Sequence, residues 1–203
     1  VTVYLEHEGQ IVQIEFLNES VYTNVSINKS GYTEVVPGQE IRYTFKDIGN
    51  NSTVPLDSFY WRDTLPTDAV RLDKIITGTY SARLNYKVVF QTNLSNTQRV
   101  LADNLNTLQN YTLDASPAAL GLASNEYVTQ VTFLFGRVPG GFRQVETPYI
   151  YCDVLSDLPH EYRFANKCDV GGMWRNQWIQ ATDRWVTIIY RGGPVPTLPR
   201  TGY

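Results

Sequence analysis

The stretch Ile41-Arg42-Tyr43-Thr44-Phe45 places an apolar or aromatic side chain at every second position. A period of two indicates a half-buried β-strand, whereas an amphipathic helix would repeat every 3.6 residues. Pro37-Gly38 lies just before this stretch and Gly49-Asn50-Asn51-Ser52 lies just after it, and both are turn or loop signals. The stretch therefore predicts one strand bounded by turns.

Similar runs lie on both sides of this strand. Residues 25–29 alternate in the same way, and the run Phe59-Tyr60-Trp61-Arg62-Asp63 is stopped at Leu65-Pro66. The 203 residues include 14 Tyr and 1 Met, a balance that favours strands because aromatic side chains fit a pleated surface. We predict further strands at residues 83–92, 127–135, 148–155, 162–170 and 185–190. This number of strands, separated by turn signals, predicts an all-β protein built as a β-sandwich.

Residues 97–122 depart from the strand pattern. Val100, Leu101, Leu105 and Leu108 approach helical spacing, and Ala and Asn replace β-branched residues there. We expect a short helix or an irregular crossover in this segment.

The two ends of the chain differ from the main domain, which we expect at residues 25–191. Residues 1–24 predict two strands around a turn at residues 7–10, and two strands alone are only marginally stable. They either add to the main sheet or are the last strands of a preceding domain. Residues 192–203 are rich in Pro and Gly and predict an extended tail.

Composition excludes several classes of function. The net charge is −3 without a basic stripe, so we expect no nucleic-acid partner. No run of about 18 apolar residues occurs, so we expect no membrane span in this sequence. We expect no cofactor and no metal site, since Cys152 and Cys168 lack the partners for a zinc site. The two cysteines could form a disulfide in an exported protein or remain two buried thiols, and the sequence leaves both open.

The tail contains a motif of specific chemistry, Leu198-Pro199-Arg200-Thr201-Gly202. It resembles the sortase signal Leu-Pro-any-Thr-Gly that anchors Gram-positive surface proteins. The resemblance implies that a sortase thiol attacks the carbonyl carbon of Thr201 and releases Gly202. An amine of a peptidoglycan precursor, or of a pilin lysine, then resolves the acyl-enzyme. The implied location is extracellular, on the cell wall. An incidental proline turn and an engineered sortase tag are the alternatives.

In that family an apolar segment and a basic tail follow the motif, and neither is in this sequence. We therefore expect the chain to be a piece of a longer protein, with the bond after Thr201 still uncut.

Other short motifs resemble the collagen-adhesin (CnaA-like) immunoglobulin-like stalk domains of Gram-positive adhesins and pilins. They are Lys29-Ser30-Gly31, Val36-Pro37-Gly38-Gln39 leading into Tyr43-Thr44, Trp61-Arg62-Asp63-Thr64-Leu65-Pro66, and Phe164-Ala165-Asn166-Lys167-Cys168-Asp169-Val170. This resemblance implies an immunoglobulin-like β-sandwich. Gln13-Ile14-Glu15-Phe16-Leu17-Asn18 is similar to the final strand of a CnaB-like domain, which favours residues 1–24 as the remnant of a preceding domain.

The resemblance also implies an internal isopeptide bond. Carried over by motif, Lys29 supplies the attacking amine, Asn166 the carboxamide, and Asp63 the carboxyl group that shuttles protons. Burial among aromatic side chains favours the neutral forms that this chemistry needs. Asn166 shares a strand face with Phe164 and Cys168, and Lys29 shares the apolar positions of its own strand, as an inward-facing pair requires.

Simpler roles remain open for these residues. Lys29 could be a solvated strand end and Asn166 a turn former, while Glu126, just before the strand predicted at residues 127–135, is a rival to Asp63 as the acid. If Cys168 pairs with Cys152, we expect the bridge to join neighbouring strands close to Asn166.

Our leading interpretation is a structural stalk or adhesin domain and not an enzyme. The first alternative is a module that binds a host surface ligand, glycan or matrix, with Trp174, Trp178 and Trp185 as a stacking platform. The second is a secreted carbohydrate-active enzyme that would use paired carboxylates such as Asp153 and Asp157.

Overall fold

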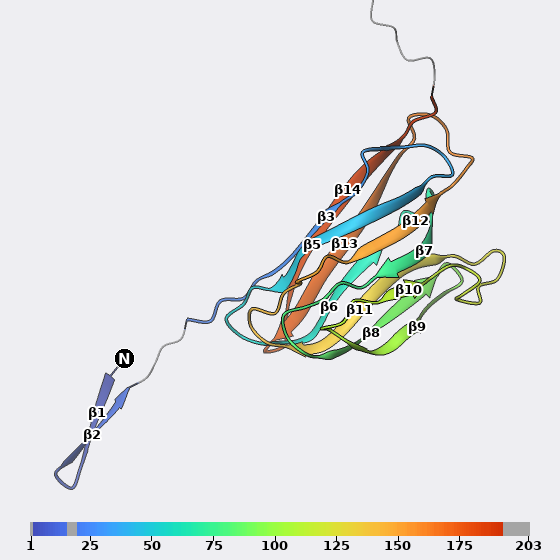
Figure 1. Ribbon diagram of the computed structural model, residues 1–203. Coiled ribbons are helices and arrows are strands. Elements are labelled where there is room, and N and C mark those ends of the chain that lie inside the picture. The colour runs from blue at the N-terminus through green and yellow to red at the C-terminus, as the bar shows by residue number, and fades with distance from the viewer. Residues whose placement is uncertain (1, 16–19, 193–203) are drawn as a thin grey trace, which may run out of the picture.

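The computed structural model describes residues 2–15 and 20–192, and every regular element in these residues is a β-strand. Two sheets face each other (Figure 1). The five-stranded sheet has the order β10 (Thr112–Asp114), β7 (Val70–Ile76), β12 (Tyr149–Val154), β5 (Glu40–Asn50) and β3 (Val25–Ser30). The seven-stranded sheet has the order β4 (Glu34–Val35), β14 (Gln177–Ile189), β13 (Arg163–Trp174), β6 (Leu56–Thr64), β11 (Val128–Val138), β8 (Asn85–Thr92) and β9 (Ser95–Asn106).

The core lies between the two sheets and is strongly aromatic. Phe45 of the five-stranded sheet meets Trp61 of the seven-stranded sheet, with ring centroids 4.8 Å apart. Trp61 also stacks on Phe133 of β11 at 4.0 Å. All three side chains are fully buried, as the alternation along β5 and β6 predicts. The expected all-β, immunoglobulin-like β-sandwich is confirmed.

Strand β3 closes one side of the sandwich. It is the edge strand of the five-stranded sheet, where it pairs with β5, and it also lies beside β13 and β14 of the other sheet. The backbone N–H of Lys29 donates a 2.7 Å hydrogen bond to Asp183 Oδ2 on β14. The first strand of the sandwich is thereby held against its last two strands.

The helix considered for residues 97–122 is wrong. The first part of the segment belongs to β9, which pairs with β8 along its length. The expected helix would have buried its leucine and valine positions together, but Val100 is 56% exposed while Leu105 is buried. Strand pairing decided the backbone here, and the rest of the segment is β10 and turns.

The described N-terminal residues form a unit apart from the two main sheets. Strands β1 (Thr2–His7) and β2 (Gln10–Glu15) form a hairpin and, within the described residues, pair only with each other. The motif Leu198-Pro199-Arg200-Thr201-Gly202 lies outside the described residues.

Candidate cross-linking site

Three strands bring Lys29, Asp63 and Asn166 to one point in the core. Lys29 is on β3, Asp63 is near the end of β6, and Asn166 is on β13, the neighbour of β6. Cys168 is the register partner of Asp63, so the alternation of β13 puts Asn166 on the same inward face, two residues away. The three expected residues therefore converge from both sheets.

The carboxyl group of Asp63 bridges the other two side chains. Lys29 Nζ donates to Asp63 Oδ1 at 2.8 Å, and Asn166 Nδ2 donates to Asp63 Oδ2 at 3.2 Å. The side chains of Lys29 and Asp63 are 0% exposed, and so is Asn166. One acid thus contacts both the amine and the amide in a site closed to water.

Aromatic rings surround the amine. Lys29 Nζ lies 4.3 Å from the ring centroid of Tyr43 and 4.1 Å from that of Phe45. Burial raises the pKa of the Asp63 carboxyl, and the charge of Lys29 acts in the opposite direction. A proton can therefore move between the amine and the carboxyl without exposing either group to solvent.

Sequence reasoning assigned Tyr43 and Phe45 to a strand but not to the site. Phe45 is the register partner of Lys29 in the antiparallel pair of β3 and β5. The signal was the antiparallel pairing of β3 with β5, because side chains directly opposite on neighbouring strands lie side by side. Asp183, which accepts the Lys29 backbone N–H, was also missed.

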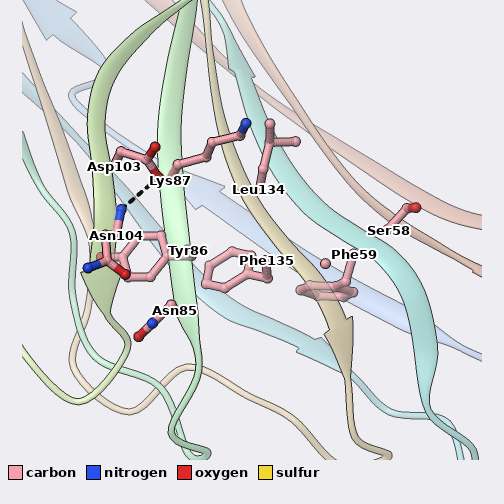
Figure 2. A pocket seen from close by; sticks show the side chains of 10 residues that line it. Ser58, Phe59, Asn85, Tyr86, Lys87, Asp103, Asn104, Leu134 and Phe135 are labelled. Atoms are coloured by element: carbon pink, nitrogen blue, oxygen red, sulfur yellow. Dashed lines mark hydrogen bonds between the residues drawn. The ribbon is translucent and has the colours of Figure 1, made fainter.

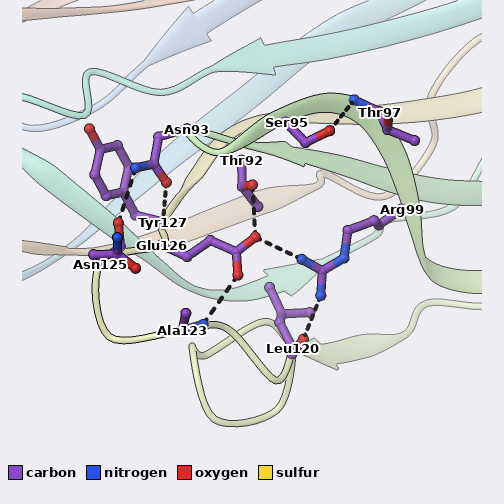
Figure 3. A network of polar contacts seen from close by, with 10 residues as sticks. All are labelled: Thr92, Asn93, Ser95, Thr97, Arg99, Leu120, Ala123, Asn125, Glu126 and Tyr127. Carbon is purple, nitrogen blue, oxygen red and sulfur yellow. Dashed lines mark hydrogen bonds and ion pairs between the residues drawn. The ribbon is translucent and has the colours of Figure 1, made fainter.

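Glu126, the rival acid, is engaged elsewhere. Its Oε1 accepts hydrogen bonds from Thr92 Oγ1 and Arg99 Nη1, both at 2.8 Å, and its Oε2 accepts the backbone N–H of Ala123 at 3.1 Å (Figure 3). The hydrogen bond from Thr92, followed by that from Ala123, lowers the pKa of Glu126. This carboxylate ties the segment before β11 to β8 and β9, and Asp63 is the acid that contacts Lys29 and Asn166.

The two cysteines are free and buried in the structure. Cys152 is on β12 of the five-stranded sheet, whereas Cys168 is on β13 of the seven-stranded sheet. The expectation of neighbouring strands is therefore wrong. The sequence left a disulfide and two buried thiols open, and the structure shows two free thiols. Burial raises the pKa of Cys168 to about 12.

The three tryptophans do not share one platform. Trp178 is 54% exposed, and its ring meets Tyr60 edge to face at 6.3 Å. Trp185 lies against the core, with Nε1 donating to the backbone oxygen of Tyr32 at 2.9 Å, and Trp174 is partly buried against the same core. A stacking surface of all three rings is excluded.

The paired carboxylates considered for glycosidase work lie at one end of β12. Asp153 is on β12 and opposite Glu40 on β5, and burial followed by the charges of Asp73 and Glu40 raises its pKa. Asp157 is in the turn that follows β12.

A separate pocket of 420 Å³ opens between β6, β8, β9 and β11 (Figure 2). Ser58, Asn104 and Gly136 line it and have positive φ angles of 52°, 52° and 71°, which mark irregularities in three strands. The rings of Tyr86 and Phe135 also line it. None of the three cross-linking residues lines this pocket.

Within residues 2–15 and 20–192, no helix is long and apolar enough to cross a membrane. The same residues contain no group of three or more metal-ligand side chains.

Comparison with known proteins bears only on the fold of this chain. No protein-family model and no curated protein matches the chain. A cohesin module of a family 33 glycoside hydrolase from Clostridium perfringens is similar at 8% identity and a TM-score of 0.43, with 83% of this chain and 98% of that chain covered.

Two collagen-binding domains are also similar in fold. The collagen-binding subdomain of the Enterococcus faecalis surface protein ACE matches at 11% identity and a TM-score of 0.33, covering 81% of this chain and 96% of its own. The collagen-binding domain of a Staphylococcus aureus adhesin matches at 10% identity and a TM-score of 0.30, covering 86% of this chain and all of its own, 100%. At these identities and TM-scores, the likeness carries no argument about function.

Proposed function

We propose that this chain is a structural stalk domain of a bacterial surface protein, stabilised by an isopeptide bond between Lys29 and Asn166. The observation that carries the proposal is the shared carboxyl group of Asp63, which contacts the amine at 2.8 Å and the amide at 3.2 Å in the buried core. A buried charge pair alone is weak evidence for stability, whereas an amine, an acid and an amide held together fit a condensation.

The reaction is balanced by one acid. Lys29 first gives one proton to Asp63, which leaves a neutral amine and a neutral acid. The amine attacks Asn166 Cγ, Asp63 gives its proton to Asn166 Nδ2, and this nitrogen leaves as ammonia. Asp63 then takes a second proton from the nitrogen of Lys29, so the product is an amide between Lys29 Nζ and Asn166 Cγ beside a protonated Asp63.

The bond would stabilise the folded domain by lowering the conformational entropy of the unfolded chain. Closing the loop from residue 29 to residue 166 removes conformational entropy worth about 5 kcal/mol by the chain-entropy model. A native domain is stable by only about 5–15 kcal/mol, so one such bond is a large share of the total.

Intact mass tests this proposal. Release of ammonia lowers the mass by about 17 Da, and digestion should yield one branched peptide that joins the Lys29 and Asn166 segments. Lys29→Met, Asp63→Asn and Asn166→Ala should each keep the full mass. Lys46→Met, at an exposed lysine of β5, is the matched control and should still lose ammonia. A wild-type chain of unshifted mass would overturn the proposal.

Anchoring is the second part of the proposal. The motif from Leu198 to Gly202 would be cleaved after Thr201 by a sortase and joined to an amine of the cell-wall precursor or of a pilin lysine, on the outside of the cell. Incubation with a purified sortase and a triglycine peptide should replace residues 202–203 by the peptide. The variant Thr201→Ala should not be cleaved. A wild-type chain that the sortase also leaves uncleaved would contradict the anchoring.

We also propose that residues 1–24 are the last strands of a preceding CnaB-like domain. In the described residues, the hairpin has Leu5 and Val12 as register partners, and each is 54% exposed. An isolated two-stranded hairpin is marginal, so it needs a further sheet to cover it. In this chain its amides should exchange with solvent far faster than those of the sandwich. Equal protection would show that it belongs to the main domain.

A second candidate function is binding of a host surface ligand. Trp178 is exposed beside Tyr60, next to a hollow of 720 Å³ on the seven-stranded sheet that Arg62, Asp169 and Gln180 help to line. An exposed indole beside polar groups suits stacking on a sugar ring. Glycan-array binding that Trp178→Ala abolishes would support this function, and identical arrays for both chains would remove it.

A further inference from the structure

Among the described residues, three buried side-chain atoms lack a hydrogen-bond partner: Tyr43 Oη, Tyr86 Oη and Asn166 Oδ1. Most buried polar atoms in proteins are paired, so each exception needs an explanation. Two of the three belong to the cross-linking site. Tyr86 lines the pocket of Figure 2 instead.

The position of the Tyr43 ring is fixed by its neighbours. Lys29 Nζ lies 4.3 Å from its centroid on one side. Gly31 lies against the ring as well, since a Cβ added there would come within 3.0 Å of Tyr43 Cδ1. Burial raises the pKa of the Tyr43 hydroxyl well above its usual range, and the side chain of Asn166 acts against that rise. Lys29 and Asn166 both contact the Asp63 carboxyl, and Lys29 contacts the Tyr43 ring, so Tyr43 and the Asn166 amide belong to one buried cluster.

The two unpaired atoms are chemically complementary. The nitrogen of the Asn166 amide already donates to Asp63 Oδ2, so its carbonyl oxygen is the part left over. That oxygen can only accept, and the Tyr43 hydroxyl can donate. A small movement that joins them would satisfy both atoms at once.

We propose that Tyr43 is a further catalytic residue of the cross-linking reaction, whose hydroxyl donates a hydrogen bond to Asn166 Oδ1 as negative charge develops there. This inference rests on the proposed isopeptide chemistry. When Lys29 Nζ bonds to Asn166 Cγ, the electron pair of the carbonyl group moves to Oδ1. When ammonia leaves, that pair re-forms the carbonyl bond. The Tyr43 proton stays on Tyr43 throughout.

Two groups then divide the work. Asp63 contacts both nitrogens and moves protons between them, whereas Tyr43 stabilises the oxygen between those two events. A donor aimed at developing charge in a dry site is worth far more than in water. A buried phenol suits this role, because its hydroxyl remains protonated.

The test compares Tyr43 with Tyr86, because each has a buried hydroxyl that lacks a hydrogen-bond partner. Tyr43→Phe keeps the ring beside Lys29 and removes only the hydroxyl. Tyr86→Phe removes the other buried hydroxyl that lacks a partner, and it is the matched control. Protein expressed by a short induction is extracted into denaturant, so that it is unfolded at the start. It is then refolded by dilution, and the reaction is stopped in samples taken at intervals. Intact mass gives the rate of ammonia loss, and tryptophan fluorescence gives the rate of folding.

We expect Tyr43→Phe to fold normally and to lose ammonia about 100-fold more slowly than the wild type. Tyr86→Phe should leave the rate unchanged. In the Lys29→Met background, where no bond forms, the two Tyr→Phe changes should alter stability equally, which a purely structural role for Tyr43 would not predict. If the wild type and Tyr43→Phe lose ammonia at the same rate, the role of Tyr43 is overturned while the bond stands. If the wild type loses none, both proposals are overturned.

Discussion

Replacing Lys29 by Met separates the covalent bond from the packing around it. Met keeps an unbranched apolar stem in a position whose side chain is 0% exposed, and it removes the attacking amine. The main loss is the loop constraint between residues 29 and 166, worth about 5 kcal/mol. Asp63 loses its cation as well, but burial raises the pKa of this carboxyl, so it can remain neutral in the core.

The expected shift in melting temperature follows from the size of the domain. The entropy of unfolding is about 2.1 cal/mol/K per residue, which gives about 0.35 kcal/mol/K for residues 25–191. A loss of about 5 kcal/mol therefore lowers the melting temperature by roughly 14 °C. Calorimetry of wild type and Lys29→Met measures this shift, with Lys46→Met as the exposed-lysine control.

The two halves of the reasoning can fail separately. If the wild type has lost ammonia and Lys29→Met melts within about 2 °C of it, the chain-entropy argument is refuted, although the bond exists. If Lys46→Met melts as low as Lys29→Met, the loss reflects the removal of a lysine charge and not of the bond. In denaturant, size-exclusion chromatography should also show the wild-type chain as more compact than Lys29→Met, because only the wild type retains a closed loop.

Three further outcomes are expected. Folding raises the pKa of Asp63, so the Asp63 carboxyl should stabilise the uncrosslinked Lys29→Met chain most below the carboxyl pKa of the unfolded chain. This stability should be lost as the pH rises through the folded pKa, by up to about 1.4 kcal/mol per pH unit. Urea unfolding at several pH values measures the loss, with a chain that also carries Asp63→Asn as the reference. Cys152 and Cys168 should resist iodoacetamide in the folded protein and react after unfolding, since burial raises the pKa of both thiols; rapid labelling of the native chain would contradict this. Glu126→Gln should still lose ammonia while the amides of residues 116–126 exchange faster, as hydrogen-exchange mass spectrometry can show, and a lost mass shift would return Glu126 to the cross-linking site.

The β-sandwich was predictable because alternation is a local signal. Ile41, Tyr43 and Phe45 all face inward because side chains two positions apart on a strand lie on the same face. The flanking turns set the ends of the strand. The inward directions of Lys29 and Asn166 followed from the same alternation. The meeting of three strands at Asp63 needed the family resemblance, since no local pattern tells which strands face each other.

The remaining errors have a common physical origin. Strand β9 is an edge strand whose sequence carries little alternation, so the sequence pattern did not show its pairing with β8. The cysteines lie only 16 positions apart in the sequence, yet they belong to opposite sheets, because the chain crosses the sandwich between β12 and β13. In both cases a short local pattern did not tell which strands pair or which sheet a strand joins.

The placement of the proposed bond also bears on how a stalk would carry tension. Lys29 is on the first strand of the sandwich and Asn166 is on the last strand but one, so a bond between them bypasses residues 30–165. Only residues 25–28 and 167–189 of the sandwich would remain in the path of a force applied at its two ends. They include most of the β13–β14 hairpin, in which Asn166 pairs with Trp185. Even if that hairpin peeled away completely, the chain would lengthen by at most about 80 Å, whereas an unbonded sandwich could release several hundred. A cross-link near the last strand thus limits how far the chain can be extended as well as whether it unfolds. A bond between two central strands would not limit the extension in this way.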